Sequence, residues 1–290
     1  MLLLARFSVA IIMVLTVAHM GAANAATCNA DTQIAKILKR GKLLAGVRYD
    51  FRPAGYIDET GKNVGFGVDI AREFAKHLGV SVEFVATTSQ TRVPLLQNGM
   101  IDAEFGVTTP EKVREEVVGF SIPYIWDKTI IMVKAGRSTK PSDYFQDPKS
   151  VIGATQGSNY VRIWQNLAPK ANMRLYQQYP EIMEALIQGQ VDVFLVSEAT
   201  GVEMKKNLGT HADGVVIGDS FLADPFAIMM APGDWRWRNW INWGLQRLWG
   251  EGTFQRLYKT YYNVEPSFDL WHGQQLQPRV SEIGKECDPW

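Results

Sequence analysis

Hydrophobic and polar positions along this chain fall into two alternating patterns. Short, almost continuous apolar runs such as KLLAGVRY and QVDVFLV are typical of strands buried on both faces. Between such runs lie longer segments such as 67–79, GVDIAREFAKHLG, in which apolar residues gather on one side of a helix. Strands that alternate with helices in this way predict an α/β fold with mainly parallel sheets.

This alternation occurs twice along the chain. The first series ends near residue 124, and the second begins after the turn at 140–143 and repeats the order of the first. Two long apolar strands, at 127–135 and 225–231, are the natural places for the chain to cross between two lobes. The expected parts are a discontinuous lobe 1 (26–133 and 226–290), a continuous lobe 2 (134–225) and a two-strand hinge. Such hinges allow closure around a ligand.

The first 25 residues have the pattern of a secretory signal peptide. Arg6 supplies a positive charge, residues 7–18 form an apolar run, and Ala23-Asn24-Ala25 matches an A-x-A cleavage site. The apolar run is short for a bilayer span, and an uncleaved membrane anchor is the alternative. In a Gram-negative host, we expect a mature chain that begins near Ala26 and is free in the periplasm.

The only two cysteines, Cys28 and Cys287, lie near the two ends of the mature chain. Export brings the chain into an oxidising compartment, which favours a Cys28–Cys287 disulfide; two free thiols near the termini are the alternative. Neither the cysteines nor the four histidines have the spacing of a metal site, so we expect no metal and no cofactor. The formal net charge of zero argues against a nucleic-acid partner.

The segment 87–124 carries the clearest binding chemistry. Ser89 and Arg92 flank the start of one predicted helix, and Thr109 and Arg114 flank the start of the next, with one short buried strand between them. Hydroxyls, free N–H groups at a helix start and an arginine fork are the partners that a planar carboxylate requires. Both turns should face one crevice outside the carboxyl ends of the strands, which predicts a carboxylate-binding site.

Several motifs, in order, resemble those of the bacterial periplasmic solute-binding proteins of the polar amino-acid type (family 3), which feed ABC importers. The motifs are GKLLAGVR, NVGFGVDIAREFAKHLG, FSIPY and EGTFQRLYKTYYN. TSQTRVPLLQNG followed by GVTTPEKVR resembles the glutamate/aspartate-binding subgroup. The resemblance covers essentially the whole mature chain, and it implies a two-lobe periplasmic binding protein type II fold with mainly parallel sheets in each lobe.

The resemblance also implies roles for single residues. Arg114 corresponds to the arginine that binds the ligand α-carboxylate, supported by Thr109 and the backbone around Val107. Arg48, and Arg92 together with Ser89, correspond to positions that bind a second carboxylate. In lobe 2, the turn that contains Ser158 and Asn159 corresponds to the turn that closes over the carboxylate.

Other positions depart from the family pattern. Ser197 occupies the slot of the aspartate that usually pairs with the ligand ammonium, and the adjacent Glu198 is a candidate substitute. Tyr179 stands where the subgroup carries histidine, Gly67 replaces an aspartate, and Val107 replaces a serine. The residues expected to bind carboxylates are therefore intact, whereas the residue expected to bind the ammonium group is replaced. A ligand with two carboxylates and no amine is therefore an alternative.

Each of these residues also has a plainer interpretation. Arg48 would be a surface residue paired with Asp50, and Arg92 would cap a helix or bridge the lobes. Arg114 would be a solvated helix residue, and Ser197 with Glu198 the start of a helix. The tryptophan-rich segment 235–249 falls near helical spacing, which favours a packed helix face over a partner contact.

We therefore expect a monomeric binding protein without catalysis, which captures an acidic amino acid and docks on ABC transporter permease subunits. One alternative is an enzyme on the same fold, similar to cyclohexadienyl dehydratases, with Glu198 as the acid/base group. Another is a sensory or accessory protein that reports the ligand to a membrane partner.

Overall fold

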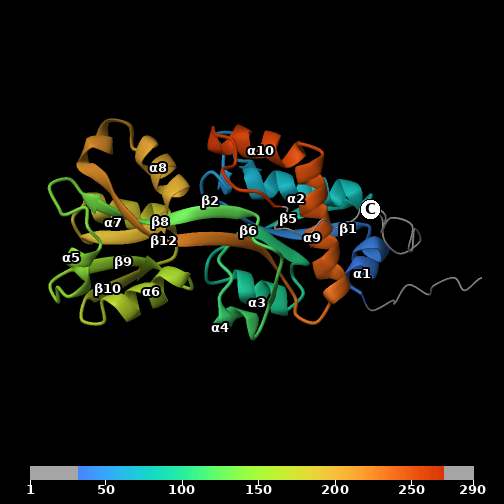
Figure 1. The fold of residues 1–290 in the computed structure, drawn as a ribbon, viewed down its shortest axis with the longest axis horizontal. Coiled ribbons are helices and arrows are strands. Elements are labelled where there is room, and N and C mark those ends of the chain that lie inside the picture. Colours follow the sequence, from blue (N-terminus) through green and yellow to red (C-terminus); the bar gives the residue numbers. More distant parts are fainter. Residues whose placement is uncertain (1–31, 271–290) are drawn as a thin grey trace, which may run out of the picture.

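The computed structural model of the 290-residue chain describes residues 32–270 (Figure 1). The expected signal peptide at 1–25 and the expected Cys28–Cys287 disulfide lie outside these residues and stay predictions. Among the helices between 32 and 270, none is long and apolar enough to cross a membrane.

One nine-stranded sheet runs through the molecule, in the order β10-β9-β11-β8-β12-β6-β1-β5, with β7 paired to β12. A small antiparallel sheet of three strands stands apart from it. The strands are β1 (Lys42–Arg48), β2 (Asp50–Phe51), β3 (Gly55–Ile57), β4 (Asn63–Val64), β5 (Ser81–Thr87), β6 (Ala103–Thr108), β7 (Gly119–Phe120), β8 (Ile125–Lys134), β9 (Val151–Thr155), β10 (Asn172–Tyr176), β11 (Val193–Ser197) and β12 (Val215–Met230).

The sheet has a parallel part in each lobe and two antiparallel strands in the middle. In lobe 1, β1 pairs in parallel with β5 and β6, and in lobe 2, β9 pairs in parallel with β10 and β11. Between them, β8 and β12 are antiparallel to each other and extend from one lobe into the other (Figure 1). The expected two-lobe α/β fold with mainly parallel sheets is confirmed, although one continuous sheet joins the lobes.

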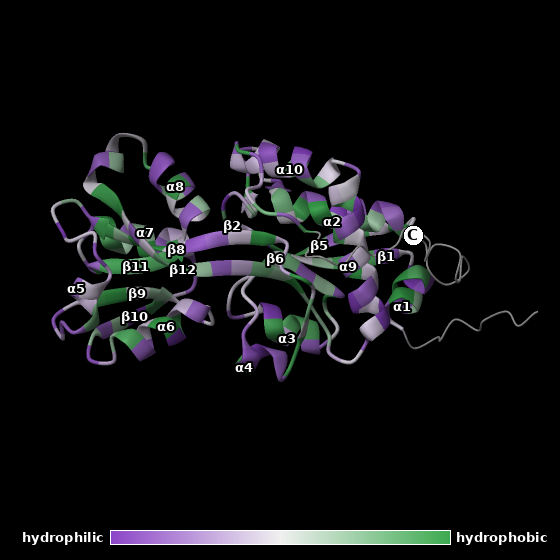
Figure 2. Ribbon diagram, viewed as in Figure 1, coloured by the Kyte–Doolittle hydropathy of each residue, from purple (hydrophilic) through white to green (hydrophobic). Residues whose placement is uncertain are grey.

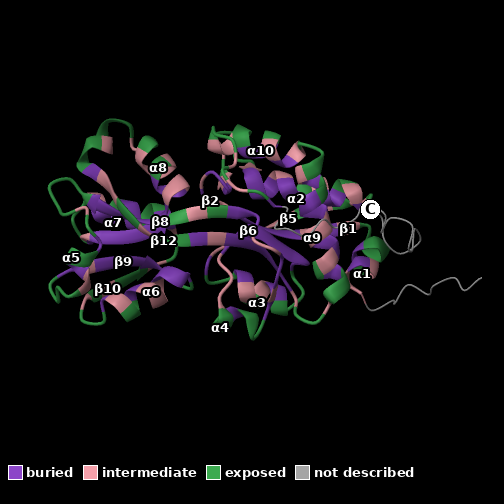
Figure 3. Cartoon of the chain, in the orientation of Figure 1, coloured by how far each residue is buried: buried purple, intermediate pink, exposed green. Residues whose placement is uncertain are grey.

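Helices cover both faces of the sheet in each lobe (Figure 1). Apolar residues lie mainly on the strands and on the inner sides of the helices (Figure 2). The central strands β6 and β11 are buried along their whole length (Figure 3). The helices are α1 (Gln33–Arg40), α2 (Phe66–His77), α3 (Arg92–Gln97), α4 (Lys112–Glu115), α5 (Ser142–Phe145), α6 (Asn159–Leu167), α7 (Tyr179–Ile187), α8 (Glu198–Lys206), α9 (Trp235–Gly250), α10 (Thr253–Tyr262) and the 3₁₀ helix η1 (Gly209–Gly214).

The tryptophan-rich helix α9 packs into the core of lobe 1, as its spacing predicts. Trp237 and Trp240 are fully buried and stack on each other, with ring centroids 5.2 Å apart. Trp240 also meets the ring of Phe74 from α2 edge-on at 5.3 Å. Trp235, at the start of the helix, remains exposed. The apolar side of α9 thus joins the core that holds the strands of lobe 1 in place.

The N-terminus of α2 lies very close to β6, which explains the glycine at position 67. A Cβ atom on Gly67 would stand 2.0 Å from the carbonyl oxygen of Phe105. Because this oxygen belongs to the backbone of a central strand, it cannot move aside cheaply. The close approach places Phe105 of β6 directly against the start of α2.

We expect Gly67→Ala to lower the free energy of unfolding by about 1–3 kcal/mol, because the added methyl group must push α2 away from β6. Gly214→Ala is the matched control, since a Cβ there meets nothing within 4 Å, and it should change stability by less than about 0.5 kcal/mol. Urea unfolding of the two variants checks this; equal stabilities would contradict the tight contact.

Candidate functional site

The expected site residues converge where the carboxyl ends of the parallel strands of the two lobes meet. In lobe 1, β1 ends at Arg48, and the turns after β5 and β6 carry the other residues of the first set. In lobe 2, the turn after β9 meets Arg114 through the carbonyl of Gly157, and Tyr179, which follows β10, lies beside Arg48. Nine of the eleven expected residues are buried: Arg48, Ser89, Arg92, Val107, Arg114, Ser158, Asn159, Tyr179 and Ser197.

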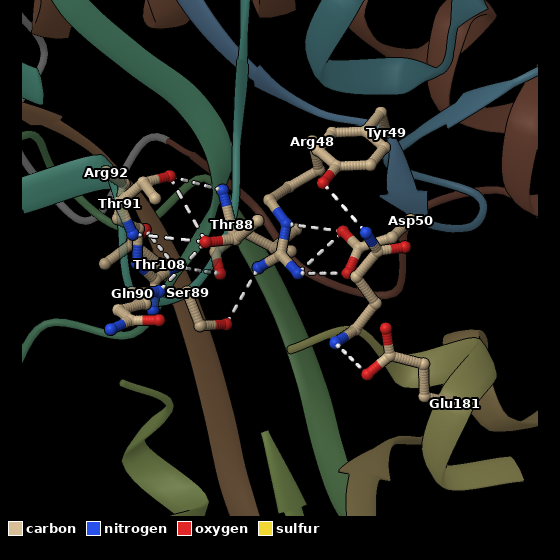
Figure 4. A network of polar contacts seen from close by, with 12 residues as sticks. Arg48, Tyr49, Asp50, Thr88, Ser89, Gln90, Thr91, Arg92, Thr108 and Glu181 are labelled. Carbon is tan, nitrogen blue, oxygen red and sulfur yellow. Dashed lines mark hydrogen bonds and ion pairs between the residues drawn. The ribbon is translucent and has the colours of Figure 1, made fainter. Parts of the chain in front are cut away.

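Arg48 makes a complete ion pair within its own lobe (Figure 4). Its Nε and Nη2 atoms donate to the two carboxylate oxygens of Asp50 at 2.9 and 3.0 Å, and its Nη1 donates to the hydroxyl of Ser89 at 3.0 Å. The rings of Phe51 and Tyr179 lie 5.3 and 5.8 Å from the guanidinium carbon. Burial alone would lower the pKa of Arg48, but Asp50 outweighs that effect and raises it. Arg48 therefore stays charged, with most of its donors already used.

Arg92 is 3% exposed, and no carboxylate contacts it directly within residues 32–270. Its Nη1 donates to the carbonyl of Val107 at 3.2 Å and to the hydroxyl of Thr108 at 2.6 Å, while its Nε has no partner. The Thr108 hydroxyl in turn donates to the fully buried carboxylate of Glu104 at 2.6 Å. Burial, and then the positive charge of Arg114, lower the pKa of Arg92 to about 9. Arg92 is a buried cation that lacks an anion at hydrogen-bond distance.

Arg114 links the two lobes. Its Nη1 donates to the carbonyl of Thr109 at 2.8 Å and lies 2.9 Å from the carboxylate of Glu111, while its Nη2 donates to the carbonyl of Gly157 in lobe 2 at 3.2 Å. Burial lowers the pKa of Arg114, and Glu111 partly opposes this. Glu111 also forms an ion pair with Arg162 of α6, so one carboxylate is shared by an arginine from each lobe.

The hinge strand β12 adds an acidic residue that the sequence patterns did not reveal. Asp224 is 1% exposed, and its Oδ1 accepts a hydrogen bond from the hydroxyl of Thr109 at 2.8 Å. Its Oδ2 accepts from the hydroxyl of Tyr160, and the side chain of Asn159 lies beside it. Burial raises the pKa of Asp224. The only signal in the sequence was an acidic residue directly before the apolar strand at 225–231.

Ser197 and Glu198, the two candidates for the ammonium-binding position, lie in different surroundings. Ser197 is buried at the end of β11 and is the N-cap residue of α8. The side chain of Glu198 is 45% exposed and faces Lys128, whose ammonium nitrogen is 3.8 Å away. The structure therefore does not bring Glu198 into the buried cluster of arginines.

Asp127 stands opposite Asp224 on the neighbouring hinge strand β8. Its carboxylate accepts hydrogen bonds from the backbone N–H groups of Lys128 and Ala199, at 2.8 and 3.3 Å. Burial, assisted by the negative charge of Asp224, raises the pKa of Asp127 to about 6. Between pH 4 and 6, the folded protein thus holds a proton at Asp127 that the unfolded chain has lost.

The ionisation of Asp127 should therefore make the protein less stable as the pH rises from 4 to 7. Asp127→Asn removes the cost of ionising this carboxyl. The free energy of unfolding of the variant should therefore rise relative to that of the parent by about 1–2 kcal/mol over that interval, after allowing for the partial exposure of the group. Urea unfolding of both proteins at pH 4.5 and 7.5 measures the difference. A constant difference at the two pH values would contradict the raised pKa.

The chain is similar to known proteins over most of its length. The sequence profile of the bacterial extracellular solute-binding proteins, family 3, matches residues 43–264. A glutamine-binding protein of Geobacillus stearothermophilus is 32% identical over 72% of this chain and 79% of the relative. The ABC transporter glutamine-binding protein GlnH of Bacillus subtilis is 27% identical over 90% and 98%. The glutamate/aspartate import solute-binding protein of Escherichia coli is 24% identical over 89% and 88%.

Solved structures agree with this assignment. The ancestral amino acid-binding protein AncCDT-1, described as a precursor of cyclohexadienyl dehydratase, superimposes with a TM-score of 0.73 at 28% identity, over 80% of this chain and all of that one. An ancestral arginine-binding protein bound to arginine gives a TM-score of 0.72 at 29% identity, over 77% and 98%. The family profile, the relatives and the fold lead to one conclusion: this chain belongs to the bacterial extracellular solute-binding proteins, family 3.

Proposed function

We propose that this protein is the periplasmic binding component of an ABC importer for an acidic amino acid such as glutamate or aspartate. It captures the ligand between its lobes, closes by bending at β8 and β12, and docks as a monomer on the membrane permease. The family and the named relatives support amino-acid binding for an ABC transporter. The acidic preference rests on the side chains described above.

The observation that carries the acidic preference is the environment of Arg92. A guanidinium that is 3% exposed loses most of its hydration, and the nearest carboxylate, Glu104, reaches it only through the Thr108 hydroxyl. A buried charge is costly unless it is paired and hydrogen-bonded. A side-chain carboxylate of the ligand would supply the missing charge, while Arg114 binds the α-carboxylate.

A neutral amino acid such as glutamine is the second candidate. The fork of Arg48 is occupied by Asp50, so only two of the three buried arginines have donors to offer a ligand. The net charge of the buried ionisable side chains around the site is zero when all six are ionised. They are Arg48, Arg92, Arg114, Asp50, Glu104 and Asp224. A zwitterion preserves this balance, and two of the named relatives are glutamine-binding proteins.

Catalysis has less support than binding. The same-fold enzyme alternative needs Glu198 as an acid/base group, but this side chain is 45% exposed and contacts Lys128 rather than the buried cluster. A general acid or base must lie within reach of the reacting atom. The contacts between the lobes instead suit a receptor in which the ligand stabilises the closed form by its differential affinity.

Isothermal titration calorimetry on the refolded mature chain tests the ligand class. We expect L-glutamate or L-aspartate to bind tightly, and L-glutamine at least ten times more weakly, because only a carboxylate neutralises Arg92. Arg92→Gln should reverse this preference, and Arg114→Ala should abolish binding of all α-amino acids. Arg162→Gln, at the exposed edge of the same interface, is the control and should keep the preference.

The other ligands in the panel decide between the alternatives. Tighter binding of glutamine than of glutamate would establish the neutral candidate. Binding of 2-oxoglutarate and succinate alone would mean that the ligand is a dicarboxylate without an amine. No heat from any of these compounds, together with turnover of prephenate or arogenate, would replace the transport proposal with an enzyme.

The closed form depends on a glycine at the interface between the lobes. Gly157 has φ +78°, and a Cβ there would lie 2.6 Å from the carbonyl oxygen of Ser89 in lobe 1. Gly157→Ala should therefore weaken ligand binding at least about tenfold, because the lobes cannot meet. Gly189→Ala, also at a positive φ but with only the Lys134 ammonium nitrogen nearby at 3.6 Å, should leave affinity unchanged. Calorimetry with the cognate ligand measures both, and equal affinities would contradict closure at this contact.

A further inference from the structure

We propose that Asp224, on the hinge strand β12, binds the ammonium group of the ligand in place of the aspartate that is missing at position 197. This inference rests on the proposed function, since it requires that the ligand be an α-amino acid. Asp224 would set the requirement for an amine, while the arginines select the carboxylates.

Asp224 is a buried anion whose hydrogen-bond partners in the described part of the chain are all neutral, and Arg114 attracts it without forming an ion pair. The hydroxyls of Thr109 and Tyr160 donate to its two carboxylate oxygens, and the side chain of Asn159 lies beside it. No lysine, arginine or histidine between residues 32 and 270 forms an ion pair with it. A carboxylate that is 1% exposed is costly to ionise without a cation, and burial raises its pKa accordingly. A ligand ammonium would offset that cost.

Thr109 fixes the spacing between the two charges that an amino acid needs. Its carbonyl oxygen accepts from Nη1 of Arg114, while its hydroxyl donates to Oδ1 of Asp224. Thus one residue separates the cation that is expected to bind the α-carboxylate from an anion suited to the ammonium. In an α-amino acid, a single carbon separates those two groups, so neighbouring binding groups of opposite charge match its head.

The position of Asp224 also couples recognition to closure. Thr109 belongs to lobe 1, Tyr160 and Asn159 belong to α6 of lobe 2, and Asp224 lies on the strand that joins the lobes. The hydroxyls that orient its carboxylate therefore come from both sides of the interface. Closure brings them together, and an amine held there would be enclosed by both lobes.

The other acidic residues near the site are less suitable. Glu198 is half exposed and faces Lys128. Asp127 accepts hydrogen bonds from two backbone N–H groups, one at the start of α8 and one within β8.

Two further acidic residues are committed to arginines of lobe 1. Glu104 accepts a hydrogen bond from the hydroxyl of Thr108, which itself accepts from Arg92. Asp50 is paired with Arg48. Asp224 differs from these residues because it is buried and shares a hydrogen-bonding neighbour, Thr109, with Arg114.

The test compares L-glutamate with 2-oxoglutarate, which keeps both carboxylates and replaces the amine with a keto oxygen. In Asp224→Asn, we expect glutamate affinity to fall at least about 30-fold. The affinity for 2-oxoglutarate should stay the same or increase, because a buried negative charge is removed. Asp219→Asn, an exposed position on the same strand, is the matched control and should change neither affinity.

A second variant guards against a general effect on folding. Tyr160→Phe keeps the carboxylate but removes the hydroxyl that orients it, and should lower glutamate affinity about 3- to 10-fold without lowering 2-oxoglutarate affinity. Equal losses for both ligands in Asp224→Asn, or an unchanged glutamate affinity, would overturn the inference. Failure of the parent protein to bind any α-amino acid would instead overturn the proposed function, so the two failures are distinguishable.

Discussion

The burial of positive charge between the lobes is the constraint on which the rest of this structure depends. Three arginines lose their water at the carboxyl ends of the central strands, and each must recover hydrogen bonds and charge from the protein or from a ligand. Arg48 recovers both from Asp50 within its own lobe. Arg92 forms hydrogen bonds, but the nearest carboxylate, that of Glu104, reaches it only through the Thr108 hydroxyl. Arg114 donates to groups of both lobes, including the carbonyl of Gly157 in lobe 2. Arg48 is thus satisfied within its own lobe, whereas Arg92 lacks an anion at hydrogen-bond distance.

The hinge that serves this interface is part of the central sheet. β8 and β12 are paired from Val215 opposite Lys134 to Phe226 opposite Ile125, so one antiparallel pair of strands connects the two lobes. The register of β12 shifts between Ile217 and Ser220 and again between Ser220 and Leu222. Such irregularities bend and twist a strand locally. These shifts lie opposite Met132, Ile130 and Thr129, where β8 also pairs with β11 of lobe 2.

The fold was largely predictable because most of its helices and strands have a recognisable local pattern of apolar and polar residues. Amphipathic helices and buried strands have their own periods in the sequence, and the two-lobe order followed from the repeat. The length of β12 was not predictable in this way, because the polar residues at 218–220 interrupt its apolar pattern. Its pairing with β8 is what keeps both halves in one strand.

The site was predictable only where its residues follow strands at turns. Arg92 and Arg114 could be placed together because parallel strands end at one edge of a sheet. The hydrogen bond between Thr109 and Asp224 joins residues 115 positions apart, and no local pattern encodes such a contact. Glu198 shows the opposite case, since the right residue type beside the right slot is turned toward solvent. The direction of a side chain at a helix start depends on packing that the sequence does not display.

The carboxylate of Glu111 has a consequence for the receptor as a whole. It is bound at once by Arg114 of lobe 1 and by Arg162 of lobe 2, whose side chain is 40% exposed. This bridge exists only when the lobes are together, and its outer half lies in water, where dissolved ions screen it. We expect dissolved salt to weaken this bridge, so that any balance between open and closed forms would shift with ionic strength.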